Sequence, residues 1–330
     1  MKNILLAALA TVTVLGGATV LAAPPPGSPG GRITAGEALY PPWQRGTNSD
    51  VTHHGLAFSV PPVDVLADFH GNVDHPALVL YIAGNDYFAI GDTVRAFEKT
   101  HPRYRGAVYY ETLPPGLLHR QLAAGGRITV GNMTWTAKPD VFMAGLGTTR
   151  AMVKAGSLSA PAVSYATNDL AIMVPKGNPG HVTGLADLGR ADLPIALPNP
   201  AWEGVARQIK ASLAVAGGPA LVKSVYTDKV AAGATALTHI HHRQTPLWLM
   251  QGRVQAGVTW TSEAVFQESI GHPVEYVTIP AAQNKRAIYA AAMVTRAAHQ
   301  AAAKAWLKFV AGPEAIGILE RYGFKPYRAK

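Results

Sequence analysis

The sequence lacks cysteine altogether and has little charge. None of its 330 residues is Cys, which excludes disulfides, thiol nucleophiles, thiolate zinc sites and iron–sulfur clusters. Charged residues make up 15% of the chain and hydrophobic residues 48%, a balance typical of a well-cored globular protein. A chain of 330 residues is long enough for two domains of ordinary size.

The positive charge of the chain is dispersed. There are 29 Lys and Arg against 20 Asp and Glu, which gives a formal charge of +9. The basic residues stand singly or in pairs such as Lys285-Arg286, and no basic block is present. We therefore expect no nucleic-acid partner. Dispersed positive charge suits small anions or an anionic membrane surface instead.

Common catalytic templates are also missing. No G-x-S-x-G elbow, P-loop, H-E-x-x-H or G-x-G-x-x-G occurs in the context that its chemistry requires. Asp86 and Glu111 both end expected strands and could approach as a carboxylate pair, although Glu111 suits a structural role equally well. The sequence predicts a protein that is not an enzyme and carries no cofactor.

The N-terminus has the layout of a secretory signal peptide. Lys2 precedes the apolar run "ILLAALATVTVLGGATVLAA", which ends in small residues before "PPPGSPGG". The alternative is an uncleaved anchor, because about 20 apolar residues can span a bilayer. Gly16-Gly17 inside the run favours removal of residues 1–22, and we expect export to the periplasm. The Pro/Gly-rich residues 23–75 are expected to pack on the first domain.

From residue 76 onward, short apolar runs alternate with amphipathic stretches. This rhythm predicts a mainly parallel α/β sheet. Buried strands are expected at "ALVLYIAGND", "GAVYYET", "KPDVFMAG", "LAIMVPKGNPG", "LPIALPNP", "AGVTWTSEA", "PVEYVTIP" and "AIYAAAMV". In the helix expected at "FAIGDTVRAFEKTHP", Ile90, Val94 and Phe97 share one face. Thr148 is expected to cap the helix "TRAMVKAG".

Polar residues gather where these strands end. Ligands bind at the carboxyl ends of strands in such sheets, where helix N-termini present free N–H groups. Each junction by itself is equally explained by ordinary helix capping. The candidate ligand-binding residues at these junctions are Asn85, Asp86, Tyr87, Thr112, Gly145, Trp202, Glu203, Thr261 and Ser262.

The stretch "THIHHRQTP", residues 238–246, has three interpretations. His239 would share a face with His241 in an extended segment or with His242 in a helix, and either pair could meet a carboxylate such as Glu263 and bind a metal ion. Arg243 could instead bind an oxyanion or carboxylate together with one of these histidines. The third interpretation is a solvated loop before the helix "TPLWLMQGR", with Thr245 as N-cap.

Several motifs together resemble a known family. They are "LVLYIAGNDYFAIGDTVRAFEKTHP", "PDVFMAG", "ATNDLAIMVPKGNP", "GLADLGRADLPIALPNPAWEGVARQIKASLA" and "AAAKAWLKFVAGPEAIGILERYGF". Across about three quarters of its length the chain resembles bacterial periplasmic solute-binding proteins of the type 2 fold. The resemblance is nearest to the molybdate-binding branch of ABC importers.

The resemblance implies an α/β protein of two lobes, each a mainly parallel sheet flanked by helices, with the ligand between them. Residues 76–164 and 281–330 would form lobe one, and residues 165–280 lobe two. It also implies a monomer that delivers an oxyanion, molybdate or tungstate first, to an ABC permease in the inner membrane. Asn85 and Asp86 fall where the family usually has a serine, and Thr112 where another hydroxyl is usual.

Other features depart from the molybdate pattern. Asp86 would repel a dianion, "ETLPPG" replaces a serine-rich turn, and the histidine stretch has no counterpart. Alternative ligands are a small organic anion, for a transporter or a sensor, and a metal ion. The metal would be bound by His241, His242, Glu263 and Glu111, with Asp86 as a further candidate.

Overall fold

A computed structural model describes residues 68–130, 133–201, 203–239 and 241–328. All of them belong to one compact unit that spans residues 32–330. The predicted signal peptide and residues 23–67 lie outside the described residues, so their roles stay predictions. Within the described residues, no helix combines the length and the apolar character that a membrane crossing requires.

Lobe one is built on a seven-stranded sheet with the order β1-β3-β2-β6-β13-β7-β14. Its centre is apolar because every residue of β2, "LVLYIA", is buried. The strands are β1 (Asp68–Gly71), β2 (Leu78–Ala83), β3 (Val108–Leu113), β6 (Val141–Gly145), β7 (Val163–Asn168), β13 (Ala287–Met293) and β14 (Lys325–Pro326).

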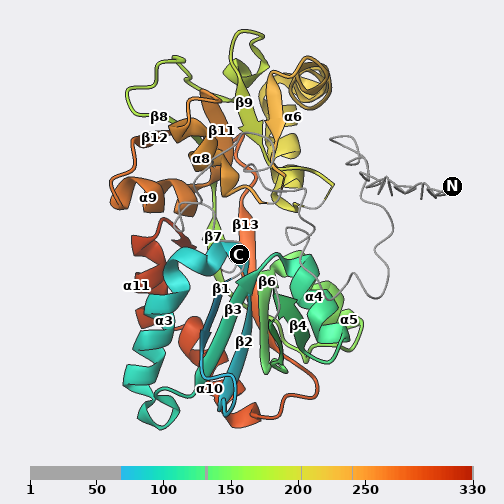
Figure 1. The fold of residues 1–330 in the computed structure, drawn as a ribbon, viewed down its shortest axis with the longest axis vertical. Coiled ribbons are helices and arrows are strands. Elements are labelled where there is room, and N and C mark those ends of the chain that lie inside the picture. Colours follow the sequence, from blue (N-terminus) through green and yellow to red (C-terminus); the bar gives the residue numbers. More distant parts are fainter. Residues whose placement is uncertain (1–67, 131–132, 202, 240, 329–330) are drawn as a thin grey trace, which may run out of the picture. The chain divides into compact units, whose positions relative to one another are not determined.

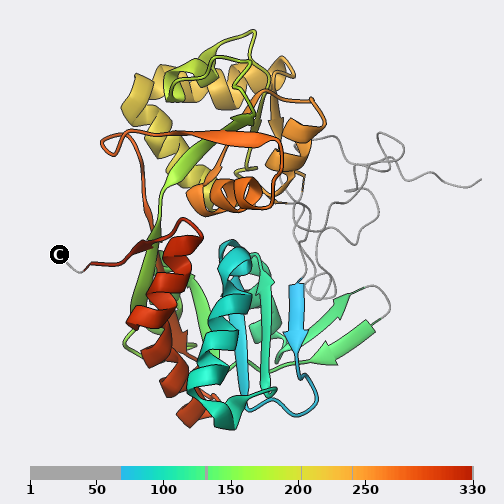
Figure 2. The same cartoon turned by 90° about the vertical axis from the view of Figure 1, so that its left-hand side faces the viewer.

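Helices cover both faces of this sheet (Figure 1). One face packs on α3 (Tyr87–Thr100), α10 (Gln300–Val310) and α11 (Pro313–Arg321), which lie side by side in Figure 2. Phe97 of α3 meets Trp306 of α10 edge to face, with ring centroids 5.2 Å apart. The other face packs on α4 (Pro115–Ala123) and α5 (Leu146–Lys154). A hairpin of β4 (Arg127–Val130) and β5 (Met133–Thr136) adjoins α4.

Lobe two is built on a five-stranded sheet with the order β10-β9-β11-β8-β12. Its strands are β8 (Leu170–Pro175), β9 (Ile195–Leu197), β10 (Thr235–Leu237), β11 (Ala256–Trp260) and β12 (Val274–Thr278). The helices of this lobe are α6 (Val205–Lys223), α7 (Lys229–Ala231), α8 (Gln244–Met250) and α9 (Thr261–Ser269), with a π-helix at Ser224–Asp228 and a 3-10 helix at Leu185–Gly189.

Both sheets are mixed, whereas the sequence suggested mainly parallel ones. In lobe one β3, β2 and β6 are parallel, and in lobe two β10, β9 and β11 are parallel. The remaining pairings are antiparallel, because β7, β8 and β13 carry the chain between the two sheets and run against their neighbours. The chain leaves the first sheet after Asn168 and returns at Ala287. The predicted two-lobed α/β fold class is confirmed.

Three local predictions were wrong. Helix α5 begins at Leu146 after Gly145, so Thr148 lies inside the helix and does not cap it. Helix α8 begins at Gln244, which places Thr245 inside it too. The segment "TSEA", read as strand, begins helix α9. Helices α5 and α9 begin directly after β6 and β11, so no separate capping residue precedes them, whereas α8 begins seven residues after β10 ends at Leu237.

Candidate functional site

In lobe one, consecutive parallel strands deliver the chain to the same sheet edge. Strand β2 ends in a 3-10 turn at Gly84–Asp86 that leads directly into α3. Strand β3 leads into α4 and β6 into α5. Helix N-termini carry exposed N–H donors and about half a positive charge. This edge of lobe one therefore favours negative charge.

In lobe two, the segments after β9, β10 and β11 also leave one sheet edge. Glu203 follows β9, the histidine stretch follows β10, and Glu263 lies in the first turn of α9 after β11. These three parallel strands are neighbours in the sheet. The topology thus collects side chains from positions up to 60 residues apart (203 to 263) at one edge.

Arg243 joins the two edges. Its side chain is only 2% exposed, and its Nη2 donates a hydrogen bond to the carbonyl oxygen of Gly84. The guanidinium carbon lies 4.3 Å from the ring centroid of Tyr87 and 5.7 Å from that of Phe88. A planar cation of lobe two is therefore held against the start of α3 in lobe one by cation–π contact and a hydrogen bond.

Gly84 permits this approach. A methyl group at that position would lie 3.2 Å from Arg243 Nη2 and 3.5 Å from His241 Nε2. Arg243 would have to move by a few tenths of an ångström to admit it, whereas the distance to His241 is an ordinary van der Waals contact. The absence of a side chain at Gly84 thus lets Arg243 reach the backbone of lobe one.

Beside Arg243 lies a buried group of imidazoles and carboxylates. His242 Nδ1 is 2.9 Å from Glu203 Oε2, and its backbone N–H donates to the same oxygen at 2.7 Å. His242 Nε2 is 3.4 Å from Glu263 Oε2. The rings of His241 and His242 have centroids 3.8 Å apart. Hydroxyl groups support both carboxylates, that of Thr238 on Glu203 and that of Thr259 on Glu263.

Burial shapes the charges of this group. Desolvation, with the nearby His242 and Arg243, lowers the pKa of His241 well below its usual range, so its ring is neutral near pH 7. Desolvation also raises the pKa of Glu263, against the opposing effect of His242. Glu203, His241 and His242 each offer a ligand atom within 4.8 Å of the others, as a metal site requires.

Other predicted site residues form hydrogen bonds from these two sheet edges to β7 and β13, the strands that connect the lobes. Asn85 Nδ2 donates to the Tyr289 hydroxyl of β13 at 2.7 Å, and Asp86 Oδ2 accepts from the Tyr165 hydroxyl of β7 at 2.6 Å. In lobe two, Ser262 Oγ accepts from Asn168 Nδ2 at 2.8 Å. The residues after β2 and β11 are thereby coupled to the strands that link the lobes.

Comparison with known proteins decides what kind of protein this is. The family model of bacterial extracellular solute-binding proteins matches residues 78–325, three quarters of the chain. The chain belongs to this family.

Its relatives include oxyanion binders. The molybdate-binding protein ModA of Mycobacterium tuberculosis is 25% identical over 213 residues, which cover 64% of this chain and 74% of that protein. The structure of a sulfate-binding protein from the same species superposes with a TM-score of 0.64 at 21% identity and covers 76% of this chain and 87% of that one. For the periplasmic molybdate-binding protein of Azotobacter vinelandii, the TM-score is 0.60 at 19% identity, with coverage of 76% and 100%.

In this solute-binding protein, Asp86 is less of an obstacle to an anion than the sequence suggested. Its side chain is 1% exposed and faces Tyr165. Desolvation raises the pKa of Asp86 to about 7, although the hydrogen bond from Tyr165 opposes the shift. The carboxyl is therefore partly protonated at neutral pH, and its repulsion of a dianion is reduced.

Several predicted residues lie apart from the Arg243 contact. Thr112 donates to Asp68 at 2.9 Å. Glu111 accepts from Tyr109 at 2.8 Å and from Gln121 at 3.4 Å inside lobe one, so it is not grouped with the histidines. Gly145 precedes α5, and Thr261 begins α9 with its N–H donated to the Asp169 carbonyl. Trp202 lies outside the described residues.

The interpretation of the histidine stretch as a solvated loop is wrong. His241, His242 and Arg243 are 6%, 4% and 2% exposed. Their partners come from other elements, and the sequence carries no local signal for them. Sequence reasoning also missed Gly84, Tyr165 and Tyr289. Of these, only Gly84 left a trace, because a glycine directly after a buried strand indicates close backbone approach.

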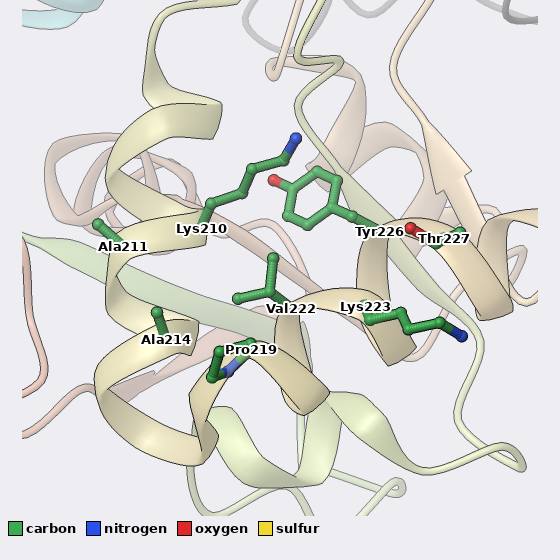
Figure 3. Close-up of a pocket in the computed structure, with 8 residues that line it drawn as sticks. All are labelled: Lys210, Ala211, Ala214, Pro219, Val222, Lys223, Tyr226 and Thr227. Carbon is green, nitrogen blue, oxygen red and sulfur yellow. The ribbon is translucent and has the colours of Figure 1, made fainter.

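A pocket of about 510 Å³ lies along α6 and the π-helix that follows it (Figure 3). Lys210 places its ammonium 4.7 Å from the centroid of the Tyr226 ring there. None of the predicted site residues lines this pocket.

Proposed function

We propose that this protein binds a tetrahedral oxyanion, molybdate or tungstate first, and delivers it to an ABC permease. The observation that carries the proposal is the buried guanidinium of Arg243, which lobe two holds against Gly84 and Tyr87 of lobe one. A ligand bound at this contact would touch both lobes, and its binding would favour their closed arrangement.

The chemistry of the contact suits an oxyanion. The guanidinium has a planar fork of N–H donors that matches the oxygens of such anions and keeps its charge at every physiological pH. The start of α3 adds backbone N–H groups and a partial positive charge on the lobe-one side. Molybdate- and sulfate-binding proteins among the relatives support the same ligand class.

We further propose that the protein acts as a monomer in the periplasm, after removal of residues 1–22, and that it catalyses no reaction. The solute-binding family and the signal-like N-terminus support this assignment. Asn85, Asp86 and Ser262 form hydrogen bonds with residues of β7 and β13, the strands that connect the lobes. Ligand binding near these residues would therefore drive a hinge motion at β7 and β13, and the permease would recognise the resulting closed form.

Thermal unfolding with a panel of ligands tests the ligand class. Protein stripped of bound ligand would be heated with molybdate, tungstate, sulfate, phosphate, small carboxylates or divalent metals at fixed pH. A true ligand at about 100 times its Kd contributes about 2.7 kcal/mol, which raises Tm by about 5 °C. We expect this rise with molybdate or tungstate. A rise with only a carboxylate or only a metal would replace the oxyanion by that class.

A further inference from the structure

Glu203, His241 and His242 form a ligand set for a metal ion that is separate from the guanidinium of Arg243. One nitrogen or oxygen atom from each lies within 4.8 Å of the others, and the three side chains are at most 7% exposed. Two imidazoles and one carboxylate form a three-ligand zinc site, in which a fourth position stays open for water or another oxygen ligand.

The surroundings of His242 match those of a metal-bound histidine. One ring nitrogen, Nδ1, faces Glu203 at 2.9 Å, and the other, Nε2, faces Glu263 at 3.4 Å. A histidine that binds a metal through one nitrogen usually donates its other N–H to a carboxylate, which fixes the ring orientation. Glu263 is placed for that role, and the Thr259 hydroxyl in turn donates to Glu263.

A second observation favours a cation at this site. Glu263 is 0% exposed, and within the described residues its Oε1 has no hydrogen-bond partner. Glu203, also buried, lies on the opposite side of the same imidazole. Burial of carboxylates is costly unless opposite charge or hydrogen bonds compensate it. A dication among these side chains would provide that compensation.

We propose that Glu203, His241 and His242 bind one divalent d-block metal ion, with Zn²⁺ as the first candidate, and that Glu263 positions His242. Zinc ligands lie about 2.0–2.2 Å from the metal, so tetrahedral ligand atoms are about 3.3 Å apart. The three side chains must therefore close by up to about 1.5 Å from the 4.8 Å limit. A proton on His242 Nδ1 would be displaced by the metal, either to Nε2, from which it is donated to Glu263, or, where Nε2 already carries one, to solvent.

The hydrogen bond from the backbone to the ring of His241 is long. The ring Nδ1 accepts from the backbone N–H of Arg243 at 3.3 Å, which is longer than a usual N–H···O or N–H···N bond. The proposal concerns protein without solute and does not depend on which oxyanion is carried. The open fourth position would be filled by water.

Metal uptake by the full chain, purified without a histidine tag and stripped with a chelator, tests the proposal. Calorimetry with Zn²⁺ and elemental analysis after gel filtration should give one ion per chain. His241→Gln, His242→Gln and Glu203→Gln should each weaken binding by at least about 100-fold, and Glu263→Gln by about 10-fold. His239→Gln, in the same stretch but outside the ligand set, is the matched control and should bind as the wild type does.

Uptake of no stoichiometric ion by the wild type would overturn the proposal, and so would equal losses in His239→Gln and His241→Gln. If ligand variants fail to fold, Co²⁺ in the wild-type protein gives a second readout. A strong visible spectrum of a low-coordinate nitrogen and oxygen site is expected. The weak spectrum of a fully hydrated ion would contradict the site.

Discussion

Each lobe buries a polar cluster built around one or two carboxylates, and the side chains that surround these carboxylates differ between the two lobes. In lobe one, Glu111 is surrounded by neutral hydrogen-bond donors, the hydroxyl of Tyr109 and the amide of Gln121. In lobe two, Glu203 and Glu263 face the two nitrogens of His242, with Arg243 next in the chain. Both clusters are almost fully buried.

The difference distinguishes a buried polar group that serves only the fold from a group that can bind a ligand. Neutral donors contact only one oxygen of the Glu111 carboxyl, Oε2, whereas Oε1 has no hydrogen-bond partner among the described residues. These donors offer no charge to a ligand. Imidazoles and a guanidinium beside carboxylates can exchange partners with a ligand or a metal, and Arg243 reaches the other lobe. Changes at Glu111 should therefore alter stability alone, whereas changes around Arg243 should alter binding.

The largest effect is expected from Glu111→Gln, as a change in the pH dependence of stability. Desolvation raises the pKa of Glu111 to about 8. A carboxyl whose folded pKa is raised contributes stability below its unfolded pKa, and that contribution is lost as pH rises through the folded value. Between pH 5 and pH 8 the wild type should lose on the order of 3 kcal/mol relative to the variant. Urea unfolding across this range measures it.

The exposed Glu320 provides a control, since Glu320→Gln should follow the wild-type profile. Solute affinity should change less than about 2-fold in Glu111→Gln, because its cluster is internal to lobe one. Parallel stability profiles for Glu111→Gln and the wild type would show that Glu111 is ionised in the fold.

The next effect is the loss of solute affinity in Arg243→Gln. Truncating one partner of a buried charge pair costs about 2–5 kcal/mol, so the Kd for molybdate should rise at least about 30-fold. Arg253→Gln removes another arginine of lobe two, stacked on Trp248 at 4.8 Å, and should leave the Kd unchanged. Calorimetric titration compares the two. If the Kd is as little changed in Arg243→Gln as in Arg253→Gln, Arg243 does not contribute to the binding site.

A smaller effect is expected from Gly84→Ala. The added methyl group would press on Arg243 Nη2 at 3.2 Å, which overpacks the contact by roughly 1 kcal/mol. We expect an affinity about 5-fold weaker. Gly147→Ala, where a methyl group meets open space, is the control at another helix start. An unchanged Kd in Gly84→Ala would mean that the close approach is not needed for binding.

The smallest effect should come from the pocket on α6. Lys210 and Lys223 line it, and an anion could bind there instead of at Arg243. Lys210→Ala with Lys223→Ala should change the Kd for molybdate by less than about 2-fold, as measured by the same titration. A loss of affinity as large as that of Arg243→Gln would place the anion site in this pocket, within lobe two alone.

Sequence reasoning was reliable where the signal is local. The pattern of Ile90, Val94 and Phe97 placed α3, and the continuous apolar run of β2 marked a buried central strand. Both depend on periodicity within one segment. The antiparallel strands were not predicted, since pairing direction depends on where the chain crosses between sheets.

The candidate site could be predicted only in part. The residues at strand ends followed from topology, but polar residues such as His241 and Arg243 suggest a surface loop when they are read alone. They are buried because the fold packs this stretch against residues that are distant in the sequence. Glu203 is 39 residues from its partner His242, and Gly84 is 159 residues from its partner Arg243. The partners of Asn85 and Asp86 are 204 and 79 residues distant. Such tertiary pairs leave no periodic signal in one sequence.

Crystals grown with tungstate and measured at the tungsten absorption edge would show whether the anion binds at Arg243. The anomalous signal locates the bound anion without any assumption about its site. We expect one strong peak per chain within hydrogen-bonding distance of the Arg243 guanidinium and between the two lobes. A single peak elsewhere, or crystals without a tungsten peak from protein soaked at saturating tungstate, would contradict this expectation.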